Sequence, residues 1–295
     1  MLPGEEIVEP HRFEEVQEAT GFEAAPMPAE PAVLPLHEIN IRLPARHNET
    51  LRRITERVNA DEELWGLWRA VNVNAVARLG MSDHGPVHVQ IVANIALKLL
   101  RMLAEHGVEP SIVRDHGLTR AEAEVVVVLA SLLHDLGMSI HRLDHEQYSL
   151  FLANGKLHDL LAGLYPPAIQ VIVTSEVLHA IIAHRAGGHP LTLEAGVTRV
   201  ADALDMAKGR TRIPFEAGKI NIHSLSATAI DRVLIERGQD KPIRIRVEMS
   251  NSAGIFQLDE LLKDKLHGSG LEPYVEVEAT IAGESERKLL QVFRL

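Results

Sequence analysis

Apolar residues recur at the spacing of one helix face through most of the chain between residues 50 and 208. In the stretch that opens at Pro86, for example, Val92, Ala96 and Leu99 follow one another at intervals of four and three residues. Because an α-helix has about 3.6 residues per turn, such intervals place side chains on one face of a helix. The pattern therefore predicts that this region is helical almost throughout.

Start and stop signals divide the region into separate helices. Thr119 and Glu122 have the spacing of a capping box, and Gly137 follows the end of the same apolar run. Further breaks are predicted at Asn154-Gly155, Pro166-Pro167 and Gly187-Gly188. We expect helices over residues 51–58, 64–79, 86–107, 119–135, 144–153, 168–186 and 192–207.

After about residue 213 the pattern changes to alternating and β-branched residues. The segments RVLIE (232–236) and IRIRVEM (243–249) are typical of strands. A helix over 253–266 and two more strands over 275–281 and 289–293 are expected to follow. The fold class is therefore mainly α, with a helical domain over residues 46–212 followed by a small α+β domain over residues 213–295.

The first 45 residues differ from the rest in composition. They are rich in glutamate, and repeated prolines prevent a continuous helix. We expect residues 1–45 to form an acidic, proline-rich tail, either a flexible arm or an extended strap along the domain. The alternative is that the segment around Val33, Leu34 and Leu36 docks onto the domain or onto a second subunit.

Charge and composition narrow the classes of function. The formal net charge of −11 argues against a binder of nucleic acid polymers and against docking on an anionic membrane. The absence of cysteine excludes disulfides, thiolate catalysis and cysteine zinc sites. The N-terminus lacks the pattern of a secretory signal, and the longest uninterrupted apolar run, VVVVLASLL, stops at His134. We expect a cytoplasmic protein that forms a homodimer.

Histidines and acids lie inside the apolar helical runs or at their ends. They are His88, the adjacent pair His134 and Asp135, His184 and Asp202. Burial of such groups is unfavourable unless something satisfies them, and a divalent ion satisfies imidazoles and carboxylates together. Separate core or capping histidines without a metal are the alternative.

This series resembles the HD-domain metal-dependent phosphohydrolase superfamily over roughly residues 80 to 210. His88 is followed by Val92, Ala93 and Ala96, the pair His134-Asp135 is followed by Gly137, and Asp202 follows Ala201. The resemblance implies that His88, His134, Asp135 and Asp202 are ligands of a divalent ion such as Mn²⁺, Fe²⁺, Co²⁺, Ni²⁺, Zn²⁺ or Mg²⁺. The same family places Asp135 as a bridge between two ions where a second site exists.

A second metal site would use His145 and His184, which lie where the family has its additional histidines. The best-known two-metal relatives carry a His-His pair where this chain has His184-Arg185. The sequence therefore leaves open whether the protein binds one ion or two.

Further polar residues flank these positions. His84 lies before the first helix of the series and could touch the substrate or donate a proton to a leaving group, whereas an N-terminal cap by Asp83 is the simpler alternative. Asp205 could orient a ligand histidine. Lys208 and Arg210, with Arg212, could bind a substrate phosphate or stabilise a helix C-terminus.

The expected function is a metal-dependent phosphohydrolase. It would cleave a phosphomonoester or phosphodiester, with a nucleotide as the expected small substrate, by a metal-activated water and with Asp135 and His84 in the reaction. Two alternatives stay open: a regulatory protein that binds a nucleotide-like ligand through an HD-like domain without turnover, and oxygen activation at a di-iron centre.

Overall fold

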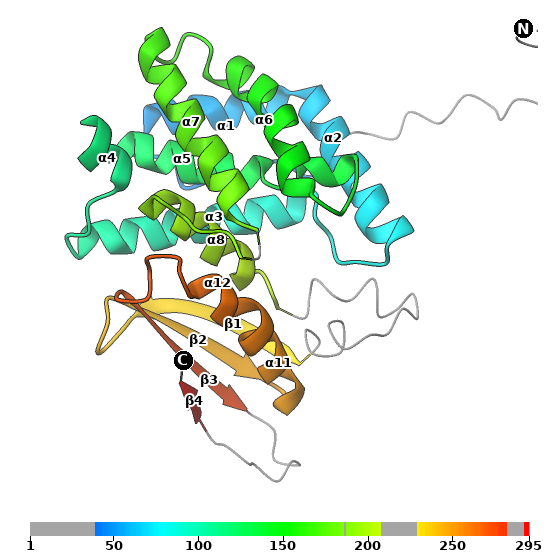
Figure 1. The fold of residues 1–295 in the computed structure, drawn as a ribbon, viewed down its shortest axis with the longest axis vertical. Coiled ribbons are helices and arrows are strands. Elements are labelled where there is room, and N and C mark those ends of the chain that lie inside the picture. The colour runs from blue at the N-terminus through cyan, green and yellow to red at the C-terminus, as the bar shows by residue number, and fades with distance from the viewer. Residues whose placement is uncertain (1–38, 186, 208–228, 282–291, 295) are drawn as a thin grey trace, which may run out of the picture. The chain divides into compact units, whose positions relative to one another are not determined.

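Helices and a small sheet make up the part of the chain that the computed structural model describes, residues 39–185, 187–207, 229–281 and 292–294 (Figure 1). The mainly α fold class with a small C-terminal sheet is confirmed. The first 38 residues of the expected tail, the expected boundary between residues 212 and 213, and the start of the strand expected at 289–293 lie outside the described residues.

The helical part is built around α5, whose residues from Val125 to Leu133 are fully buried. Helices α3, α7 and α8 pack directly on α5, and α6 packs on α7 (Figure 1). The elements are α1 (Glu49–Ala60), α2 (Glu62–Asn72), the π-helix η1 (Val73–Arg78), α3 (Pro86–Glu105), α4 (Ser111–His116), α5 (Arg120–Leu133), the 3-10 turn η2 (Leu136–Ser139), α6 (His145–Leu161), α7 (Pro167–Ala183) and α8 (Leu193–Leu204).

Local sequence sets where several of these helices begin. The side chains of Asn48, Asp61 and Thr192 accept hydrogen bonds from backbone N–H groups in the first turns of α1, α2 and α8. The capping box of Thr119 and Glu122 is formed at the start of α5. These caps satisfy donors that a helix N-terminus otherwise leaves without a partner.

One sequence expectation for a single helix is wrong, and one helix was not expected. Asn154 and Gly155 do not end a helix, because α6 continues to Leu161 and buries Leu157 and Leu160 in the core. The cost of one helical glycine, about 1 kcal/mol, is smaller than the gain from burying two leucines. The helix expected over 64–79 is present, as α2 continued by the π-helix η1, whereas the short helix α4 was missed.

The end of the N-terminal segment runs extended beside α1 and α3. Ile41 is buried and pairs with Asn59 of α1, which accepts from the Ile41 N–H (2.8 Å) and donates to its carbonyl (2.9 Å). The N–H of Arg42 donates to Gln90 of α3 at 2.6 Å. Residues 39–45 therefore form a strap on the helical part.

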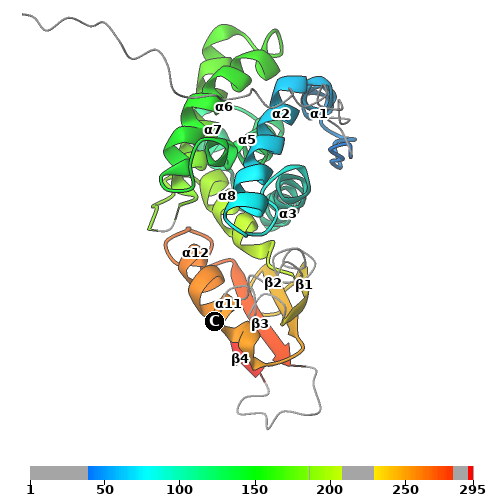
Figure 2. The ribbon, with the colours of Figure 1, turned by 90° about the vertical axis from the view of Figure 1, so that its right-hand side faces the viewer.

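The C-terminal part is a four-stranded sheet in the order β1 (Ile230–Arg237), β2 (Ile243–Met249), β3 (Val275–Ile281) and β4 (Val292–Arg294). β2 and β3 run parallel, whereas the other two neighbouring pairs are antiparallel. A parallel pair requires a crossover. Short helical turns supply it on one face of the sheet: η4 (Ser252–Gly254), α11 (Ile255–Gln257), η5 (Leu258–Lys263) and α12 (Asp264–Leu266) (Figure 2).

The sheet and the helical part share one hydrophobic core. β2 alternates buried Ile243, Ile245 and Val247 with partly exposed residues, and its buried face joins the core. η5 and α12 contact α8, and β2 contacts α3. A Cβ added to Gly196 of α8 would lie 2.1 Å from the carbonyl oxygen of Ser269, so the C-terminal backbone approaches α8 as closely as glycine permits.

α3 is long and apolar enough, by length and composition alone, to cross a membrane. In this fold 56% of its apolar window is buried inside the protein, and it packs between α5 and α8. These contacts are those of a core helix.

Gly196→Ala should destabilise the protein by about 2 kcal/mol, because the new methyl group meets a backbone oxygen rather than a movable side chain. Gly155→Ala is the matched control. A Cβ at Gly155, inside α6, meets no atom within 4 Å, so this variant should be stabilised by roughly 0.5–1 kcal/mol. Urea denaturation of both variants measures the two effects, and equal stability would contradict the close contact between α8 and residue 269.

Candidate metal centre

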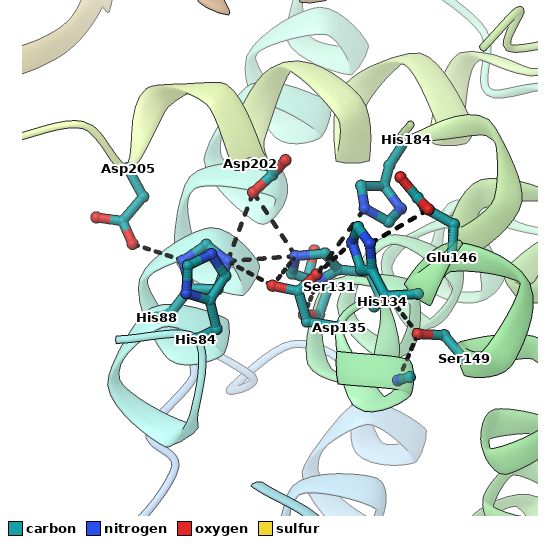
Figure 3. A network of polar contacts seen from close by, with 12 residues as sticks. His84, His88, Ser131, His134, Asp135, Glu146, Ser149, His184, Asp202 and Asp205 are labelled. Carbon is teal, nitrogen blue, oxygen red and sulfur yellow. Dashed lines mark hydrogen bonds and ion pairs between the residues drawn. The ribbon is translucent and has the colours of Figure 1, made fainter. Parts of the chain in front are cut away.

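Four side chains from three helices converge at one buried point (Figure 3). His88 lies in the first turn of α3, His134 and Asp135 directly follow α5, and Asp202 lies in the last turn of α8. His88, His134 and Asp135 are all at most 4% exposed. The four positions that the sequence assigned to one metal are therefore brought together.

The distances among their ligand atoms fit one ion. Nε2 of His88 lies 3.2 Å from Nε2 of His134, 3.4 Å from Oδ2 of Asp135 and 3.5 Å from Oδ1 of Asp202. Nε2 of His134 lies 3.3 Å and 3.6 Å from the same two oxygens. Ligands about 2.1 Å from a common ion are separated by roughly 3.0–3.4 Å in octahedral or tetrahedral geometry.

Hydrogen bonds on the far side of each imidazole turn its Nε2 inward. Nδ1 of His88 faces the carboxylate of Asp205 at 2.7 Å, and Nδ1 of His134 faces the carbonyl of Ser131 at 2.8 Å (Figure 3). When Nδ1 carries the proton, Nε2 presents its lone pair to the centre. Asp205 thus takes the orienting position that its spacing from Asp202 suggested.

The break after α5 explains how two adjacent residues reach one point. Asp135 leaves the helical conformation (φ −100°, ψ 4°), so its side chain turns back toward His134. Ser149 of α6 holds this turn: its hydroxyl donates to the His134 carbonyl at 2.6 Å and accepts from the Gly137 N–H at 2.8 Å. A Cβ at Gly137 would lie 2.0 Å from the His145 carbonyl oxygen, so this position requires glycine.

The second oxygen of Asp135 faces a second group of ligand atoms. Oδ1 lies 3.1 Å from Nε2 of His145, the first residue of α6, and 4.0 Å from Nε2 of His184, just after α7. Nδ1 of His184 donates to the Ile181 carbonyl at 2.5 Å. One atom each from Asp135, His145 and His184 lies within 4.8 Å of the other two.

The charges of the cluster depend strongly on one another. Burial would lower the pKa of His134, but the carboxylates of Asp135 and Asp202 outweigh it and raise that pKa to about 9. Burial would raise the pKa of Asp135, yet the imidazole of His134 holds it well below the usual range. The pKa of His184 is lowered by burial and by the neighbouring His134 and Lys265.

The donor set is therefore compatible with a divalent metal ion. Its carboxylates stay ionised, and its imidazoles are oriented for coordination. Without an ion, the proton held on His134 supplies part of the positive charge that the two carboxylates require.

Lys265, from α12 of the C-terminal part, also reaches the centre, which the sequence did not predict. Its ammonium group donates to Oδ2 of Asp202 at 3.2 Å and to the carbonyl of His184. Lys265 belongs to no recognisable sequence motif and lies 63 residues after Asp202, so its contact with Asp202 cannot be predicted from the spacing of residues.

A buried arginine holds this part of the C-terminal unit in place. Arg199 of α8 donates to the carbonyls of Lys265 (3.0 Å), Asp264 (2.9 Å) and Arg185 (3.0 Å), and also to that of Gly188. Burial lowers its pKa, and the carboxylates of Asp264 and Glu272 offset this only in part. Its hydrogen bonds connect the end of α7, helix α8 and α12.

The remaining predicted residues have different outcomes. His84 lies half-buried beside His88, with ring centroids 5.4 Å apart. The capping alternative also holds, because Asp83 accepts hydrogen bonds from the N–H groups of Gly85 and His88, each at 3.2 Å. The basic residues Lys208, Arg210 and Arg212 lie outside the described residues.

Asp205→Ala should weaken the binding of Mn²⁺ by roughly 10–100-fold, because His88 loses the partner that orients its ring. Asp159→Ala, which removes a side chain that is 65% exposed, is the control and should bind as the wild type does. Isothermal titration of metal-free protein measures both. Unchanged binding in Asp205→Ala would show that the carboxylate does not position the histidine.

Metal uptake should release nearly one proton per chain at pH 8. His134, with a pKa of about 9 in metal-free protein, is mostly protonated there and must lose its proton to coordinate an ion. The apparent affinity should therefore increase as pH rises toward 9, and it should level off above that value. Titrations in two buffers of different ionisation enthalpy count the protons. Metal uptake without proton release would contradict the raised pKa of His134.

Comparisons with known proteins agree with this centre. Residues 87–207, which include His88, His134, Asp135 and Asp202, match the HD domain family. The chain is also similar to the uncharacterized protein MJ1020 of Methanocaldococcus jannaschii, with 46% identity over 213 residues, 72% of this chain and 82% of that protein. The sequence motifs, the buried His/Asp cluster and these matches agree, and the chain belongs to the HD domain family.

Proposed function

We propose that this protein is a metal-dependent phosphohydrolase that cleaves a phosphate ester of a small molecule, with a nucleotide as the substrate class. The HD domain is that of a superfamily of such hydrolases, and the buried His/Asp cluster is compatible with a divalent ion. The observation that carries the proposal is the carboxylate of Asp135, which directs one oxygen to His88 and His134 and the other to His145.

The residues at the centre would hold two ions, with Asp135 contributing one carboxylate oxygen to each ligand set. The first would be held by His88, His134, Asp135 and Asp202, and the second by Asp135, His145 and His184. When bound, such ions lower the pKa of coordinated water and polarise a phosphoryl oxygen. Asp205, Ser131 and the Ile181 carbonyl hold three of the imidazoles in the orientation that coordination needs.

His84 is the candidate for proton transfer to the leaving group. It is half-buried next to His88 and outside the set of ligand atoms. Its Nδ1 lies 2.7 Å from the carbonyl of Ser82, so a proton would be exchanged with the substrate through Nε2.

A regulatory protein that binds its ligand without turnover is the second candidate. The observation in its favour is Lys265, through which the C-terminal part touches Asp202. Saturable nucleotide binding without product over hours would favour that candidate over the hydrolase.

Asp135→Asn should remove one or both ions and lower phosphatase activity by about a hundredfold or more, because the bridging charge is lost. Asp115→Asn, at a side chain that is 44% exposed, should keep metal and activity. Elemental analysis and assays on nucleotides and p-nitrophenyl phosphate measure both. Full metal content and full activity in Asp135→Asn would rule out this mechanism, and a single ion per wild-type chain would rule out the second site.

A further inference from the structure

A cavity of about 1000 Å³ lies next to the His145 and His184 side of the centre, and three arginines line it. Arg78 ends the π-helix η1, Arg142 lies in the turn between η2 and α6, and Arg185 directly follows His184. The three guanidinium groups thus come from three separate segments. Figure 3 shows Glu146, another residue of the cavity wall, at the His184 end of the network.

Hydrogen bonds hold one of these arginines in place. Arg78 donates to Oδ1 of Asn74 at 2.7 Å. Asn74 in turn donates to the carbonyls of Met138 (2.7 Å) and Ser139 (3.0 Å), in the turn that follows Asp135. These hydrogen bonds hold the π-helix η1 against the turn that follows Asp135, and Asn74 orients the guanidinium group of Arg78.

The cavity is adjacent to the candidate ligands of the second ion. A guanidinium nitrogen of Arg142 lies 2.9 Å from Nδ1 of His145, whose Nε2 faces Asp135. Arg185 directly follows His184 in the chain. A molecule in the cavity would lie among the arginines and beside His145, which Arg142 contacts.

The charges of the cavity wall favour an anion. Three arginines face two carboxylates, those of Asp144 and Glu146, and Oε2 of Glu146 lies 3.2 Å from Nδ1 of His145. An excess of positive charge is notable in a chain of net charge −11. Guanidinium groups bind phosphate through two parallel hydrogen bonds, which makes arginine suited to phosphate recognition.

Apolar side chains complete the same wall. Leu79, Ile140 and Leu143 line the cavity and are 50%, 54% and 69% exposed. Large apolar side chains with this exposure, next to guanidinium groups, suit a flat aromatic ring. The volume lies at the upper end of the range of small-molecule sites, roughly 300–1000 Å³.

We propose that this cavity binds the part of a nucleotide that does not react, and that the nucleotide carries more than one phosphate group. Arg78, Arg142 and Arg185 bind the phosphates, and Leu79, Ile140 and Leu143 contact the base. The inference rests on the proposed function for the reaction at the centre, whereas binding in the cavity can be measured without it.

The test is a titration of metal-free protein with adenosine 5′-diphosphate, so that no ion holds the phosphates. We expect this nucleotide to bind more tightly than adenosine, orthophosphate or pyrophosphate, and its affinity to fall with salt. Arg78→Ala and Arg185→Ala should each weaken binding by about tenfold or more. Both side chains are exposed, so the fold should be retained, and thermal melting checks this.

Two further variants separate the parts of the site. Leu143→Asn should weaken binding of the nucleotide but much less that of pyrophosphate, because only the base contacts the apolar wall and the substitution adds no charge. Arg120→Ala is the matched arginine control, since Arg120 begins α5, about 20 Å along the helix from His134, and should bind as the wild type does.

The outcomes distinguish this inference from the proposed function. Nucleotide binding that depends on Arg78 and Arg185, in a protein without phosphatase activity, would support the cavity and contradict the hydrolase. Hydrolysis of p-nitrophenyl phosphate, with no preference of the metal-free protein for the nucleotide over adenosine, would overturn the cavity and keep the hydrolase. Arginine variants that bind the nucleotide as the wild type does would also overturn the inference.

Discussion

The structure depends on keeping the carboxylate of Asp135 ionised although it is only 4% exposed. A buried charge is strongly unfavourable unless opposite charge and hydrogen bonds compensate it. Imidazoles from the helices α3, α5 and α6 surround this carboxylate, with His88, His134 and His145 within 3.1–3.4 Å of its oxygens. The break after α5, the glycine at 137 and the hydrogen bonds of Ser149 all serve to place this one group. Metal binding would replace the proton on His134 in an arrangement of ligands that the fold already holds in place.

The C-terminal sheet is part of the same arrangement. Arg199 binds the backbone of α12 to α8, and Lys265 then reaches both Asp202 and the carbonyl of His184. Because Asp202 uses its other oxygen toward His88 and His134, a displacement of α12 would be transmitted to the ligand set. The C-terminal part therefore helps to define the centre in addition to extending the hydrophobic core.

Much of the fold follows from local sequence. Apolar spacing located α1, α3, α5, α7 and α8, and strand alternation located β2 and β3 at the bounds that the structure has. The structure differs from expectation where packing outweighs local preference. Gly155 continues α6 because neighbouring leucines are buried, and the segment before Arg78 becomes a π-helix held by Asn74 against Met138. The sheet order, with its parallel pair of β2 and β3, depends on a crossover that no local pattern specifies.

The sequence by itself indicated which residues could form the centre. His88, His134, Asp135 and Asp202 lie inside apolar helical runs or at their ends and match the family pattern, His145 follows from the same resemblance, and Asp205 follows from its spacing to Asp202. The sequence could do so because helix periodicity and short motifs are local properties of the chain. Only the tertiary structure decided that Asp135 faces two groups of ligands, that Lys265 reaches Asp202, and that Arg78, Arg142 and Arg185 share one cavity. These contacts join segments far apart in sequence, and the packing of the shared core sets their distances.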